Sequence, residues 1–347
     1  MIALGGVRAR PGASGAAAVP TAVAVPLRAA TAVSVSAAAV VLVVGLVAPG
    51  VWERWSWLPF AVGLLVGIPH GALDHLVPWW TGGTARRSRR LVVVLLAYVA
   101  LAVLTFVAAR LWPVPALLVL LVGSAVHFGV GETTVAALRT GRPEGRGPRF
   151  IASGLATVAV PFLAWPATVR PVLDVLAPGS AAVILDPRAM LVVGIGSAVV
   201  IVATLVADLV GGRRPAAAEL ALLTALFVVV PPLAAFGLYF GVWHGLRHLA
   251  RLVALDPANA DDLAARRLAR PVGRVLLQSA LPTTAVLVVL GVLLAVPGLA
   301  GHAVAGLVPI GLAVVLALTV PHMAVVAVMD RRQRPACHAQ NGGSSPA

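Results

Sequence analysis

The sequence predicts an all-α protein, a polytopic transmembrane helix bundle of about ten spans. Of its 347 residues, 60% are hydrophobic and 11% are charged, whereas soluble globular proteins usually carry about 25% charged residues. Apolar runs of about 20 residues, each sufficient to cross a hydrocarbon core of about 30 Å, recur along the whole chain. Clusters of arginine separate these runs. This pattern indicates one membrane-embedded domain flanked by polar tails.

The excess of basic residues is explained by the position of the arginines between membrane spans. All 26 are arginine, and with 12 acidic residues the net charge is +14. In a soluble protein this excess would indicate nucleic acid, but here the arginines lie in short loops between apolar runs, as in cytoplasmic anchoring of helices. We therefore expect a lipid bilayer and no nucleic acid as the partner. Cys337 is the single cysteine, so no disulfide framework exists within the chain.

The lengths of the apolar runs define the predicted spans. The run from Glu219 to Val253 is too long for one straight span, and Pro231-Pro232, which lack two backbone donors, divide it. The ten predicted spans are residues 29–50, 55–80, 91–110, 114–138, 151–177, 189–210, 217–230, 232–254, 272–296 and 302–329. The transmembrane domain is then residues 29–330, between disordered cytoplasmic tails at residues 1–28 and 331–347.

Ten spans place both termini in the cytoplasm of a multi-pass protein of the cell membrane. With this count, one side of the membrane receives the arginine clusters at residues 86–90, 139–149, 213–214, 247–274 and 331–334. The other side receives only Arg54, Arg110, Arg170 and Arg188. The positive-inside rule makes the richer side cytoplasmic.

Histidines in four of these spans are predicted to meet in the cytoplasmic half of the bilayer. His244 and His248 are four residues apart, so on a helix they share a face at a spacing that suits one metal ion. His70, His127 and His322 lie at similar depth in three other spans. A lone histidine in a bundle is usually a hydrogen-bonded structural residue, but coincidence at one depth on four helices favours a shared site.

The type of ligand narrows the choice of metal ion. Neutral imidazoles suit iron, zinc, copper or nickel, and not magnesium or calcium. A structural zinc site would normally include thiolates, and none is available, because the single Cys337 lies in the polar tail. Two other functions stay open, a bis-His haem membrane electron carrier and a metal or proton transporter. His302, at the outer start of its span, and His338, in the tail, are not expected to join the site.

Charged residues near the histidines receive separate interpretations. Asp74 lies four residues after His70, where it either orients an imidazole or acts as a cap or interfacial charge. Glu132 is rotated by about 140° from the histidine of its own span, so we expect it to face away from the ion. Arg247 and Arg251 are expected to extend toward the inner membrane interface.

The histidines lie in four sequence blocks, Gly67-Ile-Pro-His-Gly-Ala-Leu-Asp74, His127-Phe-Gly129, Trp243-His-Gly-Leu-Arg-His248 and Pro321-His322. In order and spacing these blocks resemble the Brp/Blh family of membrane β-carotene 15,15′-dioxygenases. The resemblance covers the second to the tenth span. It implies an all-helical iron(II) enzyme that splits β-carotene with O2 at the central 15,15′ double bond into two all-trans-retinal molecules. It further implies that the retinal commonly serves a microbial rhodopsin.

The resemblance also implies the roles of individual residues. Carried over by position, the catalytic iron(II) ligands are His70, His127, His244 and His248. It assigns no ligand role to His322, which with Asp74 is expected to line the cavity or to hold a ligand in place. The family often has Ser where this chain has Gly245, so the hydrogen bonds around the ligands differ there.

Overall fold

The computed structural model describes residues 21–81, 87–141, 147–300 and 304–333, and these ranges contain helices and no strand. The first half comprises α1 (Thr21–Val47), α2 (Gly50–Trp55), α3 (Trp57–Gly71), α4 (Val77–Thr81), α5 (Arg87–Leu111), α6 (Pro113–Thr140), α7 (Pro148–Ala164), α8 (Pro166–Leu176) and α9 (Ser180–Ile184). The second half comprises α10 (Pro187–Val210), α11 (Arg214–Val229), α12 (Pro232–Gly237), the π-helix η1 (Leu238–Gly245), α13 (Leu246–Leu255), the 3-10 helix η2 (Pro257–Asn259), α14 (Ala260–Ala264), α15 (Ala269–Ala300) and α16 (Val304–Gln333).

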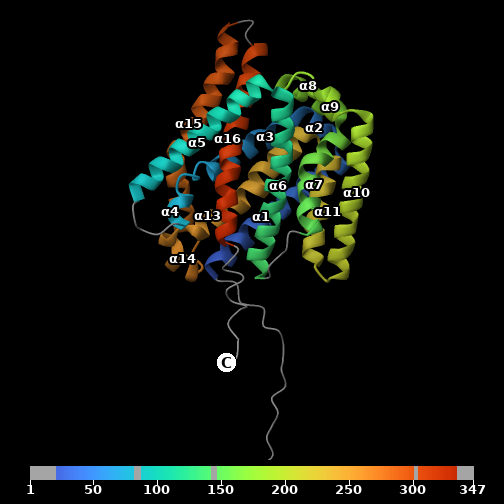
Figure 1. Ribbon diagram of the computed structural model, residues 1–347. Helices are drawn as coiled ribbons and strands as arrows, with labels where there is room; N and C mark the ends of the chain where they lie inside the picture. The colour runs from blue at the N-terminus through green and yellow to red at the C-terminus, as the bar shows by residue number, and fades with distance from the viewer. Residues whose placement is uncertain (1–20, 82–86, 142–146, 301–303, 334–347) are drawn as a thin grey trace, which may run out of the picture.

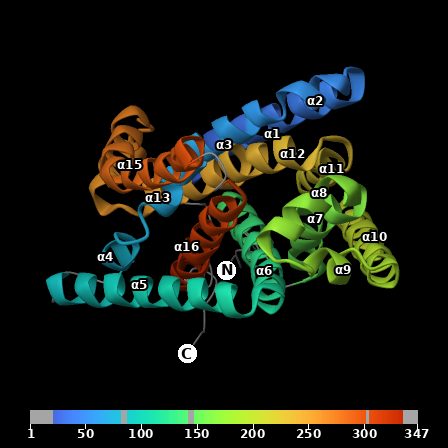
Figure 2. The same ribbon diagram turned by 90° about the horizontal axis from the view of Figure 1, so that it is seen from above.

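The helices form one bundle with a packed centre. Helices α6, α7, α10 and α11 stand roughly upright side by side, and α5 runs obliquely across the bundle (Figure 1). Seen from above, α6 and α16 lie between α5 and a band that contains α1, α3 and α12 (Figure 2). Helix α16 packs against α5 and α6, and α3 packs against α12 and η1. This arrangement directs α3, α6, η1 and α16 toward one interior region.

Glycines allow α3 to cross the α12–η1 segment at backbone contact. A Cβ atom on Gly63 would lie 1.9 Å from the carbonyl oxygen of Gly237, and one on Gly241 would lie 2.3 Å from the carbonyl oxygen of Gly63. A Cβ on Gly67 would lie 2.5 Å from the ring of Phe240. Small residues spaced by four are a common solution for close helix packing in membranes. The crossing fixes the C-terminal end of α3 beside η1.

Proline explains the predicted break in the longest apolar run. Helix α11 ends at Val229 and α12 begins at Pro232, so the division at Pro231-Pro232 is confirmed. The second predicted span is not one helix, because α3 ends at Gly71 and turns precede α4. The fifth is also divided, with α7 and α8 bent by 103° at Trp165.

Five helices among the described residues are long and apolar enough to cross a membrane, or six if the bent pair α7–α8 is one span. The five apolar segments are Val23–Val47, Leu91–Leu111, Pro113–Thr140, Pro187–Val210 and Ala269–Val289. Large apolar side chains on α5 face outward, including Leu96 and Leu104, each 64% exposed. An apolar exterior of this kind is consistent with a membrane protein. Helix α1 begins at Thr21, inside the range predicted as a tail, and its Leu27 is fully buried.

Candidate metal centre

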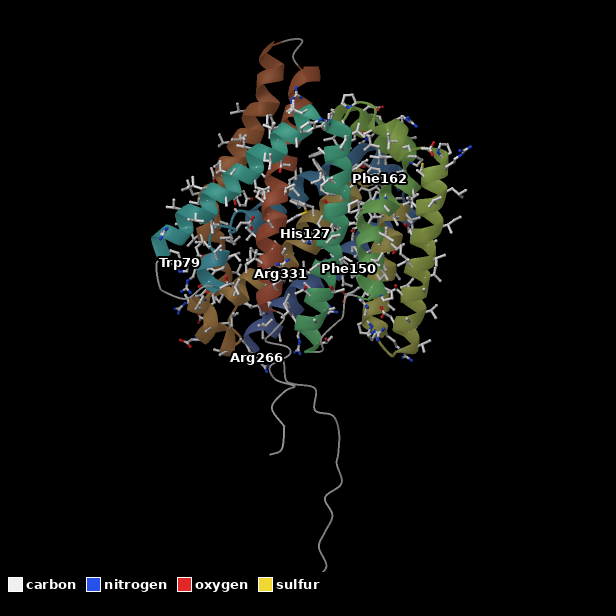
Figure 3. The ribbon with its side chains drawn as sticks, in the orientation of Figure 1. Trp79, His127, Phe150, Phe162, Arg266 and Arg331 are labelled. Carbon is white, nitrogen blue, oxygen red and sulfur yellow. The ribbon has the colours of Figure 1, made fainter. Side chains whose placement is uncertain are left out.

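Five histidine side chains from four regions of the chain meet inside the bundle. They are His70 at the end of α3, His127 on α6, His244 on η1, His248 on α13 and His322 on α16. Ring centroids of the contacting pairs lie between 5.0 and 6.0 Å apart. We call these five residues the histidine cluster. Figure 3 shows His127 part-way along the bundle, between Phe162 toward one end and Arg266 at the other. The predicted meeting of the five is confirmed.

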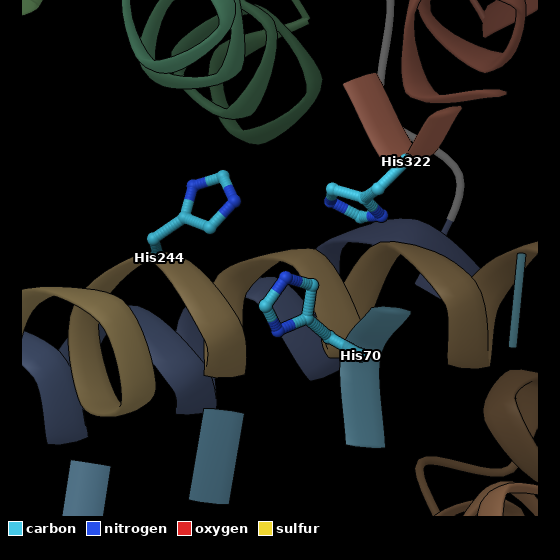
Figure 4. Close-up of side chains that lie close together, drawn as sticks. All are labelled: His70, His244 and His322. Carbon is cyan, nitrogen blue, oxygen red and sulfur yellow. The ribbon is translucent and has the colours of Figure 1, made fainter. Parts of the chain in front are cut away.

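Three members form the tightest group. His70, His244 and His322 are buried, and one ring nitrogen of each lies within 4.8 Å of the other two. Figure 4 shows the three rings converging from three helices. Histidine nitrogens bind a divalent metal at about 2.0–2.1 Å, which places two ligands of one ion about 3–4.2 Å apart. Small side-chain movements therefore bring all three to one ion.

A fourth histidine meets this group at ligand spacing. Nε2 of His127 lies 3.3 Å from Nε2 of His244, within the range expected for two imidazoles on one ion. The rings of His244 and His248 stack at 6.0 Å with an interplanar angle of 18°. The π-helix η1 carries His244, and single π turns occur frequently at functional sites. Nothing in the residue spacing alone predicts that π-helix.

Several ring nitrogens lack the partner that burial normally requires. His70 Nδ1, both nitrogens of His248 and His322 Nε2 are buried and have no hydrogen-bond partner among the described residues. Buried polar atoms in proteins are nearly always satisfied, and exceptions call for an explanation. A metal ion bound through the lone pair of each imidazole would satisfy one nitrogen of each ring. The donor set therefore fits a transition metal.

Asp74 contacts the imidazole of His322 and not that of His70, which lies four residues before it. Its carboxylate oxygens lie 3.0 and 2.9 Å from Nδ1 of His322. The hydroxyl of Tyr98 is 3.3 Å from Asp74 Oδ2. The expectation that Asp74 would face His70 at i+4 fails because α3 ends at Gly71, so Asp74 lies in a turn beyond the helix.

A second buried polar group lies on the other side of η1 and α13. Glu132 accepts hydrogen bonds from Trp243 Nε1 at 3.0 Å and from Arg247 Nη1 at 3.1 Å. Arg247 Nη1 also lies 2.9 Å from Glu219, which pairs with Arg139 at 2.6 Å. We call these five residues the arginine–acid network. Glu132 faces away from the histidine cluster, as predicted.

The arginines do not extend to an interface. Arg247 and Arg251 are each 1% exposed. Arg251 donates to Asp330 and to Gln333 at the end of α16. The expectation of an interfacial position was wrong because both side chains find acidic or amide partners on neighbouring helices. His302, Cys337 and His338 lie outside the described residues.

The comparisons with known proteins agree with the sequence blocks. The family described as Beta-carotene 15,15'-dioxygenase matches residues 60–330. A protein of Halobacterium salinarum named "Probable beta-carotene 15,15'-dioxygenase Blh" is 36% identical over 79% of this chain and 84% of the relative. "Beta-carotene 15,15'-dioxygenase" of an uncultured marine bacterium is 28% identical over 56% and 68%, respectively. "Probable beta-carotene 15,15'-dioxygenase Brp" of Halobacterium salinarum is 29% identical over 77% and 81%. No solved structure matches.

Proposed function

Because this chain belongs to the β-carotene 15,15'-dioxygenase family, we propose that it cleaves β-carotene with O2 at the central 15,15′ double bond. The two halves of the polyene each gain one oxygen atom and leave as all-trans-retinal. The observation that carries the proposal is the histidine cluster, whose five members all lie in residues 60–330, the range matched by the family.

The metal proposed for this site is iron(II), with His70, His127, His244 and His248 as its ligands. When bound, iron(II) would supply an open coordination position for the activation of O2. The donor set supports this choice, because imidazole without thiolate suits an exchangeable transition metal better than a structural zinc. The unpartnered nitrogens of His70 and His248 provide lone pairs for binding.

The chain's own residues hold the ligands and exclude water. The ring of Phe240 packs edge-on against His70 at 5.4 Å, and that of Phe128 packs against His244 at 5.0 Å. Trp243, the residue before His244, is fully buried. These apolar neighbours suit a hydrocarbon polyene, and the apolar exterior of the bundle supports entry of substrate from the bilayer.

The membrane arrangement belongs to the same proposal. The domain of residues 29–330 spans the cell membrane about ten times, with both termini cytoplasmic. Short helices such as α11, and the α12–η1–α13 segment, would each complete a crossing that length and composition alone do not identify. Retinal released into the bilayer would be available to a microbial rhodopsin in the same membrane.

The two other functional classes are less well supported. A bis-His haem carrier needs a flat macrocycle between two axial histidines, but the rings of this cluster already contact one another at 5.0–6.0 Å. A transporter needs polar groups along a path across the bundle, whereas the hydrophobic core that contains Tyr239 of η1 also includes Phe227, Leu223 and Leu226.

Co-expression in cells that accumulate β-carotene tests the reaction. We expect loss of colour and accumulation of retinal, identified by chromatography against authentic standards. We expect no apocarotenals that are longer or shorter than retinal. Cells that carry His70→Ala in place of the parent provide the control for spontaneous oxidation. Retinal at the control level, with the parent protein present in the membrane, would contradict the proposal.

Reporter fusions test the orientation. We expect fusions in the loops near residues 86–90 and 139–149 to report the cytoplasm, and a fusion at Pro231-Pro232 to report the outside. A cytoplasmic report at Pro231-Pro232 would contradict the ten-span arrangement without affecting the reaction.

A further inference from the structure

We propose that His322 is itself a metal ligand, and that Asp74, held by Tyr98, is the carboxylate that orients it. This inference rests on the proposed metal-dependent function and extends its ligand set beyond the four histidines predicted from sequence. The observation behind it is the convergence of His322 with His70 and His244 in the tightest nitrogen group of the described residues (Figure 4).

The hydrogen bond to Asp74 fixes which nitrogen of His322 is available. Nδ1 lies 3.0 and 2.9 Å from the two carboxylate oxygens, so Nδ1 carries the proton and donates it. A neutral imidazole then has its lone pair on Nε2. Carboxylate–histidine–metal arrangements of this kind set the tautomer and raise the basicity of the ligand.

The free nitrogen points into the cluster. His322 Nε2 is buried and has no hydrogen-bond partner among the described residues. The ring of His322 lies 5.0 Å from that of His70, 5.4 Å from that of His127 and 5.5 Å from that of His248, centroid to centroid. Contact with three of the four predicted ligands places His322 inside the group and not at its edge.

A simple ion pair does not account for this arrangement. If His322 were protonated to pair with Asp74, its Nε2–H would be a buried donor, and no acceptor among the described residues lies within hydrogen-bond distance of it. Leaving a charged donor unsatisfied in the interior is costly. With a metal on Nε2, the lone pair is used, and the positive ion also compensates the buried carboxylate of Asp74.

Tyr98 holds Asp74 in the orienting position. Its hydroxyl lies 3.3 Å from Asp74 Oδ2 and 3.3 Å from the carbonyl oxygen of Leu318 on α16. One hydroxyl proton shared between these acceptors links α5, the turn after α3 and the helix that carries His322. Asp74 is 3% exposed, and its carboxylate contacts the His322 ring and the Tyr98 hydroxyl.

The test measures metal binding by the full-length protein in detergent, with cobalt(II) as the probe and with iron(II) content as a second readout. We expect His322→Ala to bind cobalt(II) at least about 10-fold more weakly, with an altered visible absorption spectrum because one nitrogen is lost. Added imidazole should restore the parental spectrum. Asp74→Asn should weaken binding about 10- to 100-fold while His322 is retained, and Tyr98→Phe should have a smaller effect of the same sign.

A nearby histidine outside the cluster provides the matched control. His75 contacts the carbonyl oxygen of Ala72 through Nδ1 at 3.1 Å, so His75→Ala should match the parent in affinity and spectrum. If His322→Ala fails to fold, Asp74→Asn, which keeps an acceptor for Nδ1, decides the question. Parental affinity and spectrum in both variants would overturn the inference. A parent protein that binds neither cobalt(II) nor iron(II) would instead overturn the proposed function.

Discussion

The histidine cluster and the arginine–acid network share one helical segment and differ in what they lack. Trp243 and Arg247 face the network, whereas His244 and His248, each one residue further along, face the cluster. In the network, each of the charged side chains has an opposite charge within 3.1 Å. In the cluster, four buried ring nitrogens have no partner among the described residues. The fold completes its own interactions on one face and leaves donors for an added ion on the other.

Arg247 illustrates the limit of that contrast. Its Nε and Nη2 have no hydrogen-bond partner among the described residues, but its guanidinium lies 3.9 Å over the ring of Trp243. Such stacking is favourable for a desolvated cation. The network is therefore held by charge pairing and stacking inside the protein, and we expect its loss to affect stability, whereas loss of a cluster member affects metal binding.

The largest expected effect comes from the cluster. His244→Ala removes a nitrogen that contributes both to the three-histidine group and to the 3.3 Å contact with His127. We expect cleavage of β-carotene to fall by more than about 100-fold, the upper end of the loss seen when only a supporting residue is removed. Retinal formation and iron per chain, measured on the same preparation, check this prediction. A folded variant, by circular dichroism, with parental iron and retinal would contradict it.

Removal of a member of the arginine–acid network should lower the stability of the protein. Glu132→Ala removes the acceptor of Trp243 and one of the two carboxylates that face Arg247. Breaking a buried ion pair by removing one partner typically costs about 3–5 kcal/mol. We therefore expect a large drop in the temperature of thermal unfolding in detergent, with iron per folded chain retained. Unchanged unfolding combined with lost iron would reverse the roles assigned to the two regions.

Sequence reasoning predicted the parts of both regions that depend on local spacing. The helical class, the break at Pro231-Pro232 and the meeting of five histidines follow from apolar runs, proline and depth, and the fold contains them. The partner of Asp74 could not be predicted, because it depends on the packing of α16 near the end of α3. Arg247 and Arg251 were misplaced for the same reason, since their acidic partners lie on other helices. The π-helix η1 has no simple sequence signal.

Substitution at the crossing of α3 with the α12–η1 segment should have an effect of intermediate size. Gly63→Ala places a Cβ 1.9 Å from the carbonyl oxygen of Gly237. The backbone of one of the two segments must move to avoid this clash. Overpacking typically costs about 1–3 kcal/mol, and the displaced α3 should also weaken metal binding through His70. Gly196→Ala is the matched control, because a Cβ there meets nothing within 4 Å. Equal unfolding temperatures for the two variants would contradict close backbone packing at this crossing.

The smallest expected effect lies at the ion pair of Asp262 and Arg267, whose arginine is exposed. Asp262 accepts from Arg267 Nε at 3.0 Å, and the arginine side chain is 64% exposed. Exposed pairs contribute about 0–1 kcal/mol because water and salt screen them. Asp262→Asn should leave unfolding temperature, iron content and retinal formation near the parental values. A drop in unfolding temperature as large as that of Glu132→Ala would show that burial does not separate structural from surface ion pairs in this protein.

The central claim is that histidines of this cluster bind a functional iron ion. Anaerobic loading of the purified full-length chain with iron(II), followed by X-ray absorption spectroscopy, tests that claim most directly. We predict one iron per chain, nitrogen neighbours at about 2.0–2.2 Å, and the outer-shell scattering that imidazole rings produce. Iron that does not bind stoichiometrically, or a first shell of oxygen atoms without imidazole scattering, would contradict the account.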